Sequence, residues 1–262
     1  MTLSARQMVL ELISAHADRA SEFPVRSLVR AAELFSLSES SVRVALLRLT
    51  QERRLESPRR GMYRLGQAAV PVHERVSGWR SLDGLLEEWD GTSWLGVLSG
   101  HLARSDRKAV RRRERALRLW GLEPLAPGLH VRPANLQGGR EGLQRRLLDL
   151  GLEAQALVVA VSDLGERDPA ARHLWPTPEL DGNYRRMSES LEESERRLDA
   201  MELPEAARET FLMGREALRL LVLDPLLPAP LVDAAERRRL GETMTRYDAR
   251  GHALWRAFLR MS

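Results

Sequence analysis

Residues 36–66, SLSESSVRVALLRLTQERRLESPRRGMYRLG, decide how the front of the chain folds. Ser38 is a good N-cap for a helix, because its hydroxyl can accept a hydrogen bond from an unpaired amide of the first turn. The helix that follows carries an apolar face at three- and four-residue spacing, formed by Val42, Ala45, Leu46 and Leu49. Beyond it, the basic turn 58–61 separates residues 55–57 from residues 62–65, which predicts a β-hairpin.

Two more helices precede this segment. Apolar residues recur at helical spacing across residues 5–16, and a second helix follows Phe23 and Pro24. The tight stretch 36–38 then separates the second helix from the third, which is the spacing of a helix-turn-helix. With the basic hairpin behind it, this order predicts a winged helix-turn-helix over residues 1–66.

The outward side of the third helix and the tip of the hairpin carry the residues that we expect to contact DNA. Hydroxyls and amides at the start of such a helix reach phosphates, while guanidinium groups read guanine edges through paired hydrogen bonds. Arginines in the hairpin turn reach phosphates or the minor groove. The candidate DNA-binding residues are Ser38, Ser40, Ser41, Arg43, Val44, Leu47, Arg48, Arg53, Arg54, Arg59 and Arg60. A winged-helix adaptor that contacts only protein is an alternative.

The positive charge of the chain is concentrated in the same region. Residues 1–66 hold eleven Arg against seven Asp and Glu, whereas residues 67–262 hold thirty basic and thirty acidic residues. The net charge of +4 therefore lies entirely at the front. Residues 43–64 contain seven Arg and two Glu, a density that attracts a polyanion such as DNA. Charge alone would be explained equally well by a solvated helix face.

Composition excludes several kinds of site and indicates the compartment. Without cysteine there is no disulfide, no thiolate metal site and no cysteine nucleophile. No stretch approaches the roughly 18 apolar residues that span a bilayer. Glu11 and Asp18 interrupt what would be the apolar core of a signal peptide. We therefore expect a cytoplasmic protein with no membrane partner.

A linker is predicted over residues 67–87, because Pro71, Ser77 and Gly78 interrupt the helical pattern there. A second module is predicted over residues 88–165. Its strands are expected at residues 94–99, 121–125, 129–132 and 157–162, and its helices at residues 106–120 and 141–150. This order is that of a ferredoxin-like βαββαβ domain. For the arginines of the helix at 106–120, a solvated face or a contact with an acidic ligand is preferred over a second nucleic-acid surface.

Residues 178–262 predict a helical domain, so the fold class is α+β and multidomain. Helices are expected at residues 183–201, 204–223 and 232–259, with a break at Asp224-Pro225, Pro228 and Pro230. The apolar residues that can build a small helical core or a dimer surface are Leu218, Leu221, Val222, Leu254, Trp255 and Phe258. For Trp255 and Phe258, helical spacing alone favours the core.

An enzyme, specifically a metal-dependent nuclease on the ferredoxin-like module, is the alternative from another functional class. Such a site needs clustered carboxylates at a strand end. Residues 94–99 contain no acid and are followed by Gly100 and His101, and Asp163 stands alone after the last strand. The motifs GxxxxGK, GxGxxG and GxSxG are absent, and the six histidines lack metal-ligand spacing. We expect no enzyme, no metal and no bound cofactor.

Several segments, spread over nearly the whole chain, resemble the PaaX family, the repressors of phenylacetic acid catabolism. They are SLSESSVRVALLRLTQERRLE at 36–56 with its hairpin, Trp89-Asp90-Gly91 with Trp94, Trp120-Gly121-Leu122 to Pro127-Gly128-Leu129, and Asp224-Pro225-Leu226-Leu227-Pro228. The resemblance implies a homodimeric repressor with an N-terminal winged helix, a ferredoxin-like middle domain similar to small CRISPR-associated nucleases, and a C-terminal helical domain.

The best-known PaaX member releases DNA when it binds phenylacetyl-CoA. The resemblance therefore implies a ligand-responsive repressor of a catabolic operon, a partly palindromic operator in double-stranded DNA, and an acyl-CoA effector. Arginines suit the phosphates of a CoA thioester, but the resemblance assigns no ligand-binding residues. The chain departs from the family pattern at two places, Glu87-Glu88-Trp89-Asp90 and the linker segment 66–80. These departures point to a divergent relative with another inducer.

Overall fold

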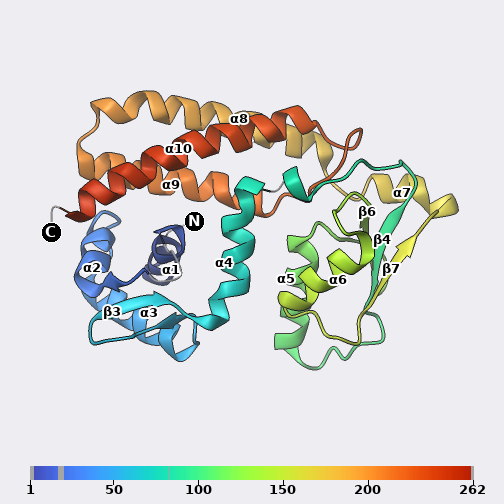
Figure 1. Cartoon of the computed structure of the whole chain (residues 1–262), viewed down its shortest axis with the longest axis horizontal. Helices are drawn as coiled ribbons and strands as arrows, with labels where there is room; N and C mark the ends of the chain where they lie inside the picture. The colour runs from blue at the N-terminus through green and yellow to red at the C-terminus, as the bar shows by residue number, and fades with distance from the viewer. Residues whose placement is uncertain (1–2, 17–20, 82, 261–262) are drawn as a thin grey trace. The chain divides into compact units, whose positions relative to one another are not determined.

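The computed structural model describes residues 3–16, 21–81 and 83–260 of the chain (Figure 1). The fold is mixed α+β, with two small antiparallel sheets and a helical C-terminal region. It divides into two compact units. Unit 1 comprises Met1–Ser77, Ser190–Glu216 and Met244–Ser262, and unit 2 comprises Gly78–Glu189 and Ala217–Thr243. The long helices α8 (Thr177–Arg197), α9 (Leu203–Val222) and α10 (Ala234–Arg260) each contribute to both units.

Three helices and a small sheet form the N-terminal part of unit 1. The helices are α1 (Ala5–His16), α2 (Val25–Glu33) and α3 (Glu39–Gln51), and the strands are β1 (Phe23–Pro24), β2 (Leu55–Glu56) and β3 (Met62–Leu65). The strand order is β1-β3-β2, and the predicted hairpin is present with Leu55 opposite Leu65. The sequence did not predict β1, which pairs Phe23 with Tyr63. Its edge position suits Pro24, because proline has no N–H to donate to another strand.

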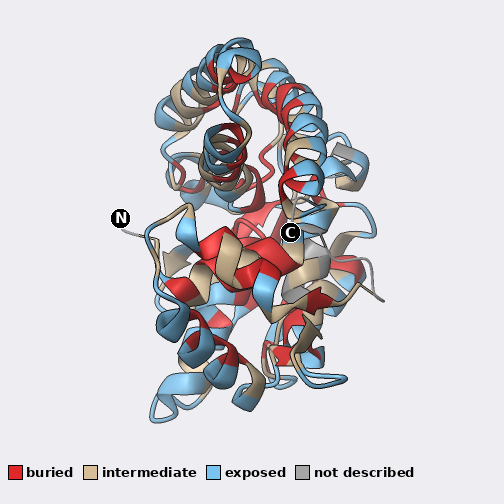
Figure 2. Cartoon of the chain, turned by 90° about the vertical axis from the view of Figure 1, so that its left-hand side faces the viewer, coloured by how far each residue is buried: buried red, intermediate tan, exposed pale blue. Residues whose placement is uncertain are grey.

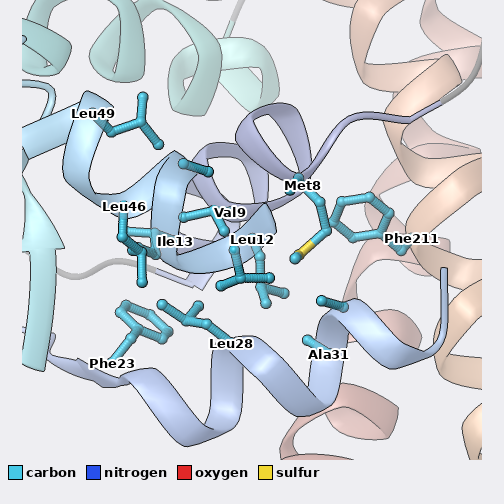
Figure 3. Packing of buried hydrophobic residues seen from close by; sticks show 14 of the residues in the cluster. Met8, Val9, Leu12, Ile13, Phe23, Leu28, Ala31, Leu46, Leu49 and Phe211 are labelled. Carbon is cyan, nitrogen blue, oxygen red and sulfur yellow. The ribbon is translucent and has the colours of Figure 1, made fainter. Parts of the chain in front are cut away.

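One apolar cluster holds these helices together. The predicted inner face of α3 is confirmed, since Val42, Ala45, Leu46 and Leu49 are all buried. They pack with the apolar stripe of α1 (Figure 3). The same cluster is completed from α9 and α10 by Ala207, Phe211, Trp255 and Phe258. Trp255 and Phe258 are thus core residues, as predicted, and they share their core with the N-terminal helices. Figure 2 shows buried and exposed residues alternating along the helices, as expected where a helix buries one face.

Most of residues 67–87, the predicted linker, are helical, and the boundary between the two units falls within them, between Ser77 and Gly78. They form α4 (Val70–Ser77) and short 3-10 helices at Gln67–Ala69, Gly78–Ser81 and Asp83–Leu85. Pro71 falls in the first turn of α4, where a helix tolerates proline because the missing N–H would have no partner there. Ala69 and Trp79 are buried, so packing orders a segment whose proline and glycine argue for a linker.

The sheet of unit 2 follows the predicted order of strand, helix, two strands, helix and strand. Its elements are β4 (Trp94–Leu98), α5 (Arg107–Leu119), β5 (Glu123–Ala126), β6 (Leu129–Pro133), α6 (Gly139–Asp149) and β7 (Leu157–Val161). The strand order is β5-β6-β4-β7, and each neighbouring pair is antiparallel. α5 and α6 lie on the same side of this sheet (Figure 1). A 3-10 helix at Gly165–Arg167 and α7 (Asp168–Arg172) follow β7.

The proline-rich break between α9 and α10 is ordered against the rest of unit 2. Asp224 accepts the N–H of Leu226 at 2.6 Å, which fixes the start of the break. Gly121 follows α5 with φ +63°, and a Cβ there would lie 2.4 Å from the carbonyl oxygen of Pro225. Glycine is therefore needed at position 121 for two reasons, its backbone conformation and the closeness of the break. Among the described residues, every helix is too short or too polar to span a bilayer.

Candidate nucleic-acid interface

A tight turn joins α2 to α3. α2 ends at Glu33, and Ser36 takes a left-handed conformation with φ 56°. The N–H of Leu37 donates to the carbonyl oxygen of Ala32 at 3.0 Å, the pattern of a helix that stops abruptly. Ser38 then caps α3, because its Oγ accepts an amide of the first turn at 3.2 Å. The predicted cap is confirmed, and α3 starts only a few residues after α2.

Three serine hydroxyls gather at the start of α3. Ser38 Oγ lies 2.9 Å from Ser40 Oγ and 2.8 Å from Ser41 Oγ, and all three residues are exposed. Hydroxyls and amides at a helix N-terminus suit phosphate oxygens, because the helix dipole and the N–H groups both favour an anion. Glu39 adds a carboxylate to the same turn, so an approaching phosphate would also meet one negative charge.

The outer face of α3 combines basic and apolar side chains. Its members recur every three or four residues, and all are exposed: Ser40, Arg43, Val44, Leu47, Arg48 and Gln51. Val44 is 48% exposed and Leu47 is 60% exposed, although the opposite face of the helix is buried. A helix that is held by one face presents the other at a fixed orientation. The outer face of α3 can therefore meet a ligand as one surface.

Two of the candidate arginines are held by carboxylates. Arg43 Nε lies 2.8 Å from Oε1 of Glu39, one turn earlier on α3, and Arg59 Nε lies 2.9 Å from Oε2 of Glu22. The side chains of Arg43 and Arg59 are 62% and 71% exposed, and such surface pairs contribute about 0.2–1 kcal/mol each. Either arginine can therefore exchange its carboxylate for a phosphate or a base edge at little cost.

Sequence reasoning missed both of these carboxylates. The four-residue spacing of Glu39 and Arg43 is typical of a helical ion pair. This pair could therefore have been predicted from the sequence. Glu22 and Arg59 are 37 residues apart, and only the folded hairpin brings them together. Glu52 was missed for the same reason: it binds Arg6 of α1 through both oxygens, at 2.6 and 2.5 Å, and this hydrogen-bonded pair lowers the pKa of Glu52.

Three other candidate arginines have no such partner. Arg48, Arg53 and Arg60 are exposed and, in the part of the chain that the structure describes, form no ion pair or side-chain hydrogen bond. Arg53 ends α3 in a left-handed conformation with φ 56°, where glycine is favoured by about 1 kcal/mol. Ending the helix therefore does not explain an arginine at this position. Arg54, the next residue, is half-buried.

The hairpin presents its basic tip from an anchored base. Leu55 in β2 is only 1% exposed, and the N–H of Val25 donates to the carbonyl oxygen of Gly61 at 2.8 Å. Gly61 has φ +75°, a conformation that suits glycine in a turn. The turn therefore joins the start of α2, while Arg59 and Arg60 stay exposed at its tip. Both predicted hairpin arginines thus lie on an ordered support.

The polar residues weighed for a metal site have local partners. Asp163 Oδ1 accepts the N–H of Gly165 at 2.7 Å, and His101 Nε2 lies 2.9 Å from the carbonyl oxygen of Gln155. Within residues 3–16, 21–81 and 83–260, no three His, Asp or Glu side chains are grouped as ligands for a metal ion.

Comparison with known proteins adds a likeness of fold. No protein-family model matches the chain, and no curated protein matches it. Among solved structures, it is similar to the uncharacterized protein Rv0674 from Mycobacterium tuberculosis, with a TM-score of 0.54 and 19% sequence identity over 95% of this chain and 99% of that chain. The resemblance to the PaaX family therefore stays a prediction, while the course of the backbone along nearly the whole chain is shared with a solved protein.

Proposed function

We propose that this chain is a DNA-binding transcriptional regulator in which α1, α2, α3 and the β2–β3 hairpin act as a winged helix-turn-helix. The observation that carries the proposal is the two-sided character of α3. One face is buried in the core of unit 1, and the other exposes Arg43 and Arg48 around Val44 and Leu47. A recognition helix needs this combination, because it must be held rigidly and still present donors and apolar groups to base edges.

Each part of the surface has a role in this proposal. Arg43 and Arg48 read base edges in the major groove, and Leu47 contacts a thymine methyl group or a neighbouring subunit. The serine hydroxyls at the start of α3 bind phosphates and set the position of the helix. Arg59 and Arg60 hold the adjacent backbone or minor groove. Arg43 must leave Glu39 to do this, so binding and the ion pair compete.

We further propose a homodimeric repressor that an acyl-CoA releases from its operator, with recognition helices in successive major grooves about 34 Å apart. This part rests on the resemblance to the PaaX family, in which the sheet of unit 2 would be the ferredoxin-like domain. The strand order β5-β6-β4-β7 supports that assignment. Because α9 and α10 share the core of the N-terminal helices and also contribute to unit 2, a ligand that shifts these helices would disturb the position of α3.

A salt-series titration tests the proposal. The purified protein is titrated against the intergenic DNA upstream of its own gene and against a scrambled duplex, with and without phenylacetyl-CoA. Tighter binding to the native fragment supports the regulator, and release by the thioester supports the inducer. Arg43→Ala and Arg48→Ala should each lose about 1–3 kcal/mol of sequence preference, whereas Arg59→Ala and Arg60→Ala should weaken binding to both duplexes. Unchanged affinity in all four variants would contradict the assignment.

The exposed apolar residues of α3 favour one other candidate, a winged-helix adaptor that binds protein. Val44 and Leu47 would then lie in a protein interface, and the surrounding arginines would form its rim. The same titration separates the two candidates, because an adaptor retains no duplex even at low salt.

A further inference from the structure

The orientation of α5 in unit 2 is fixed from both its start and its inner side. Asp106 caps the helix, and its Oδ1 accepts the N–H groups of Lys108 and Ala109 at 2.8 and 3.2 Å. Ala116 and Leu117 are buried. The remaining side of the helix must therefore face solvent.

That solvent side is strongly basic. It carries Arg107, Lys108, Arg111, Arg112, Arg115 and Arg118, all of them exposed; together they form what we call the α5 basic face. Glu114 is an exposed acid on the same helix. In the described part of the chain, none of the six cations forms an ion pair or a side-chain hydrogen bond. Six like charges are thus held side by side along one helix.

This arrangement is unlike that of the neighbouring arginine on the inner side. Arg113 is 6% exposed; it binds Glu153 at 2.9 Å and donates to the carbonyl oxygen of Ala103 at 3.0 Å. Acids are as numerous as bases over residues 67–262. Asp106 and Glu123 interact electrostatically with Lys108, Arg112 and Arg118, yet neither acid forms an ion pair with a cation of the α5 basic face. Although Arg115 is exposed overall, partial burial of its side chain, together with the charge of Arg118, lowers the pKa of Arg115. The six cations outnumber the acids near them, and a polyanion would relieve the repulsion that remains on this face.

We propose that the α5 basic face binds the sugar-phosphate backbone of duplex DNA. Arg107, Arg111, Arg115 and Arg118 follow one another at four- and three-residue intervals, which places them about 4.5–6 Å apart along the helix axis. The face spans about 16 Å, and one strand of duplex DNA carries a phosphate for roughly every 3.4 Å of its axis. A helix of this length can therefore meet about five phosphates of one strand, a number close to that of its cations. The inference rests on the proposed DNA binding, and it adds a surface separate from α3.

Binding at this face should be independent of sequence. The outward residues of α3 include serine, valine and leucine among the arginines, whereas those of α5 are cations and one glutamate. Phosphate contacts position a protein on DNA without reading bases. The α5 basic face should therefore raise affinity for any duplex and increase its dependence on salt, while α3 supplies the preference for one sequence.

The test removes three cations and leaves the buried side of α5 unchanged. The variant carries Arg107→Gln, Arg111→Gln and Arg115→Gln in the full-length chain. For each phosphate that the variant no longer neutralises, the slope of log K against log salt should become shallower by about 0.9, so three phosphates give a change of about 3. The change should be equal for the operator fragment and a scrambled duplex. Replacing the same three residues by Lys should keep most of the slope, because Lys keeps the charge.

A control variant removes the same net charge from exposed positions on α9 and α10: Arg208→Gln, Arg238→Gln and Arg246→Gln. It should bind both duplexes with the parent slope. Circular dichroism and thermal melting of both triple variants check that the fold is kept. If the slope falls as much in the control as in the α5 variant, net charge explains the effect and the inference is overturned.

Failure of this inference is distinguishable from failure of the proposed function. If the α5 variant keeps the parent slope while Arg43→Ala with Arg48→Ala loses operator preference, the chain binds DNA without the α5 basic face. If the parent binds no duplex at all, both proposals fall. If the α5 variant keeps DNA binding but no longer binds free coenzyme A, the face belongs to a small phosphorylated ligand and the inference is again overturned.

Discussion

The guanidinium group of Arg132 in β6 donates a hydrogen bond to the carbonyl oxygen of Leu226, 3.0 Å away and 94 residues further along the chain. Arg132 is fully buried, and it also donates to the carbonyl oxygen of Trp120 and to Oδ1 of Asn135. A buried cation is tolerated only where acceptors surround it. One side chain therefore joins the end of α5, the loop after β6 and the break between α9 and α10.

Arg132→Leu should lower the free energy of unfolding by about 2–4 kcal/mol, because several buried acceptors lose their donor at once. Urea unfolding followed by circular dichroism measures the loss. Arg145→Leu on the exposed side of α6 is the matched control and should change stability by less than about 0.5 kcal/mol. Equal losses in the two variants would show that the hydrogen bonds of Arg132 do not stabilise unit 2.

Gly121 and Gly91 allow backbone conformation to be separated from close packing. Both have a positive φ, +63° and +84°, but a Cβ on Gly91 would meet nothing within 4 Å. Gly91→Ala should cost about 1–2 kcal/mol from its backbone alone. Gly121→Ala should cost a further 1–3 kcal/mol or so, because its Cβ collides with Pro225. Thermal unfolding of the two variants gives the comparison, and a smaller loss at position 121 would contradict the close approach.

Substitutions at Arg53 separate the effect on the free energy of unfolding from the effect on DNA affinity. Arg53→Gly should raise the free energy of unfolding by about 0.5–1 kcal/mol, because glycine accepts φ 56° without strain. Arg53→Ala keeps the strained backbone and should not stabilise. Both variants lack the guanidinium group, so both should weaken DNA binding to the same extent. Equal melting temperatures, or unequal DNA affinities, would contradict this account.

The local parts of the fold could be predicted because their causes are local. Ser38 caps α3 through an amide three residues away, and the apolar spacing of Val42 to Leu49 decides which face is buried. The hairpin turn likewise needs only Gly61 and its neighbours. The candidate DNA-binding residues on α3 could be predicted from the same pattern, because the side of a helix opposite its buried face is exposed to solvent.

The rest depends on contacts between residues that are distant in the sequence. β1 forms because Phe23 pairs with Tyr63. A two-residue strand is too short to carry a sequence pattern that would predict this pairing. The spacing of Trp255 and Phe258 predicted the apolar face of α10. Amphipathic spacing does not show which other helix packs on such a face. The ion pair of Arg59 with Glu22 could not be predicted for the same reason. The arginine pattern of α5 could be read from the sequence, whereas the fold was needed to show that, among the described residues, these arginines form no ion pairs.

His252 gives unit 1 a stability that depends on pH. Its hydrogen bond with Asp248 raises the pKa of the imidazole to about 9, and its Nε2 lies 2.9 Å from the carbonyl oxygen of Ala15 in α1. Because the folded pKa lies above the ordinary value near 6.5, the stabilisation is complete below about pH 6.5 and is lost as pH rises toward 9. After allowance for solvent screening it amounts to about 1 kcal/mol. Urea unfolding of His252→Gln should show no loss over this interval; a loss equal to that of the parent would assign the pH dependence to other groups.

Glu39 should restrain DNA binding, because it holds Arg43 and places a carboxylate beside the phosphate-facing serines. Glu39→Gln should raise DNA affinity by about 0.5–1 kcal/mol at low salt, and the gain should shrink as salt rises. The same change should lower the free energy of unfolding by about 0.3–0.5 kcal/mol, since it removes a favourable charge from the first turn of α3. Glu242→Gln on the exposed side of α10 removes an equal charge elsewhere and should do neither. An unchanged affinity in Glu39→Gln would mean that Arg43 does not exchange its carboxylate for DNA, and base reading would then fall to Arg48.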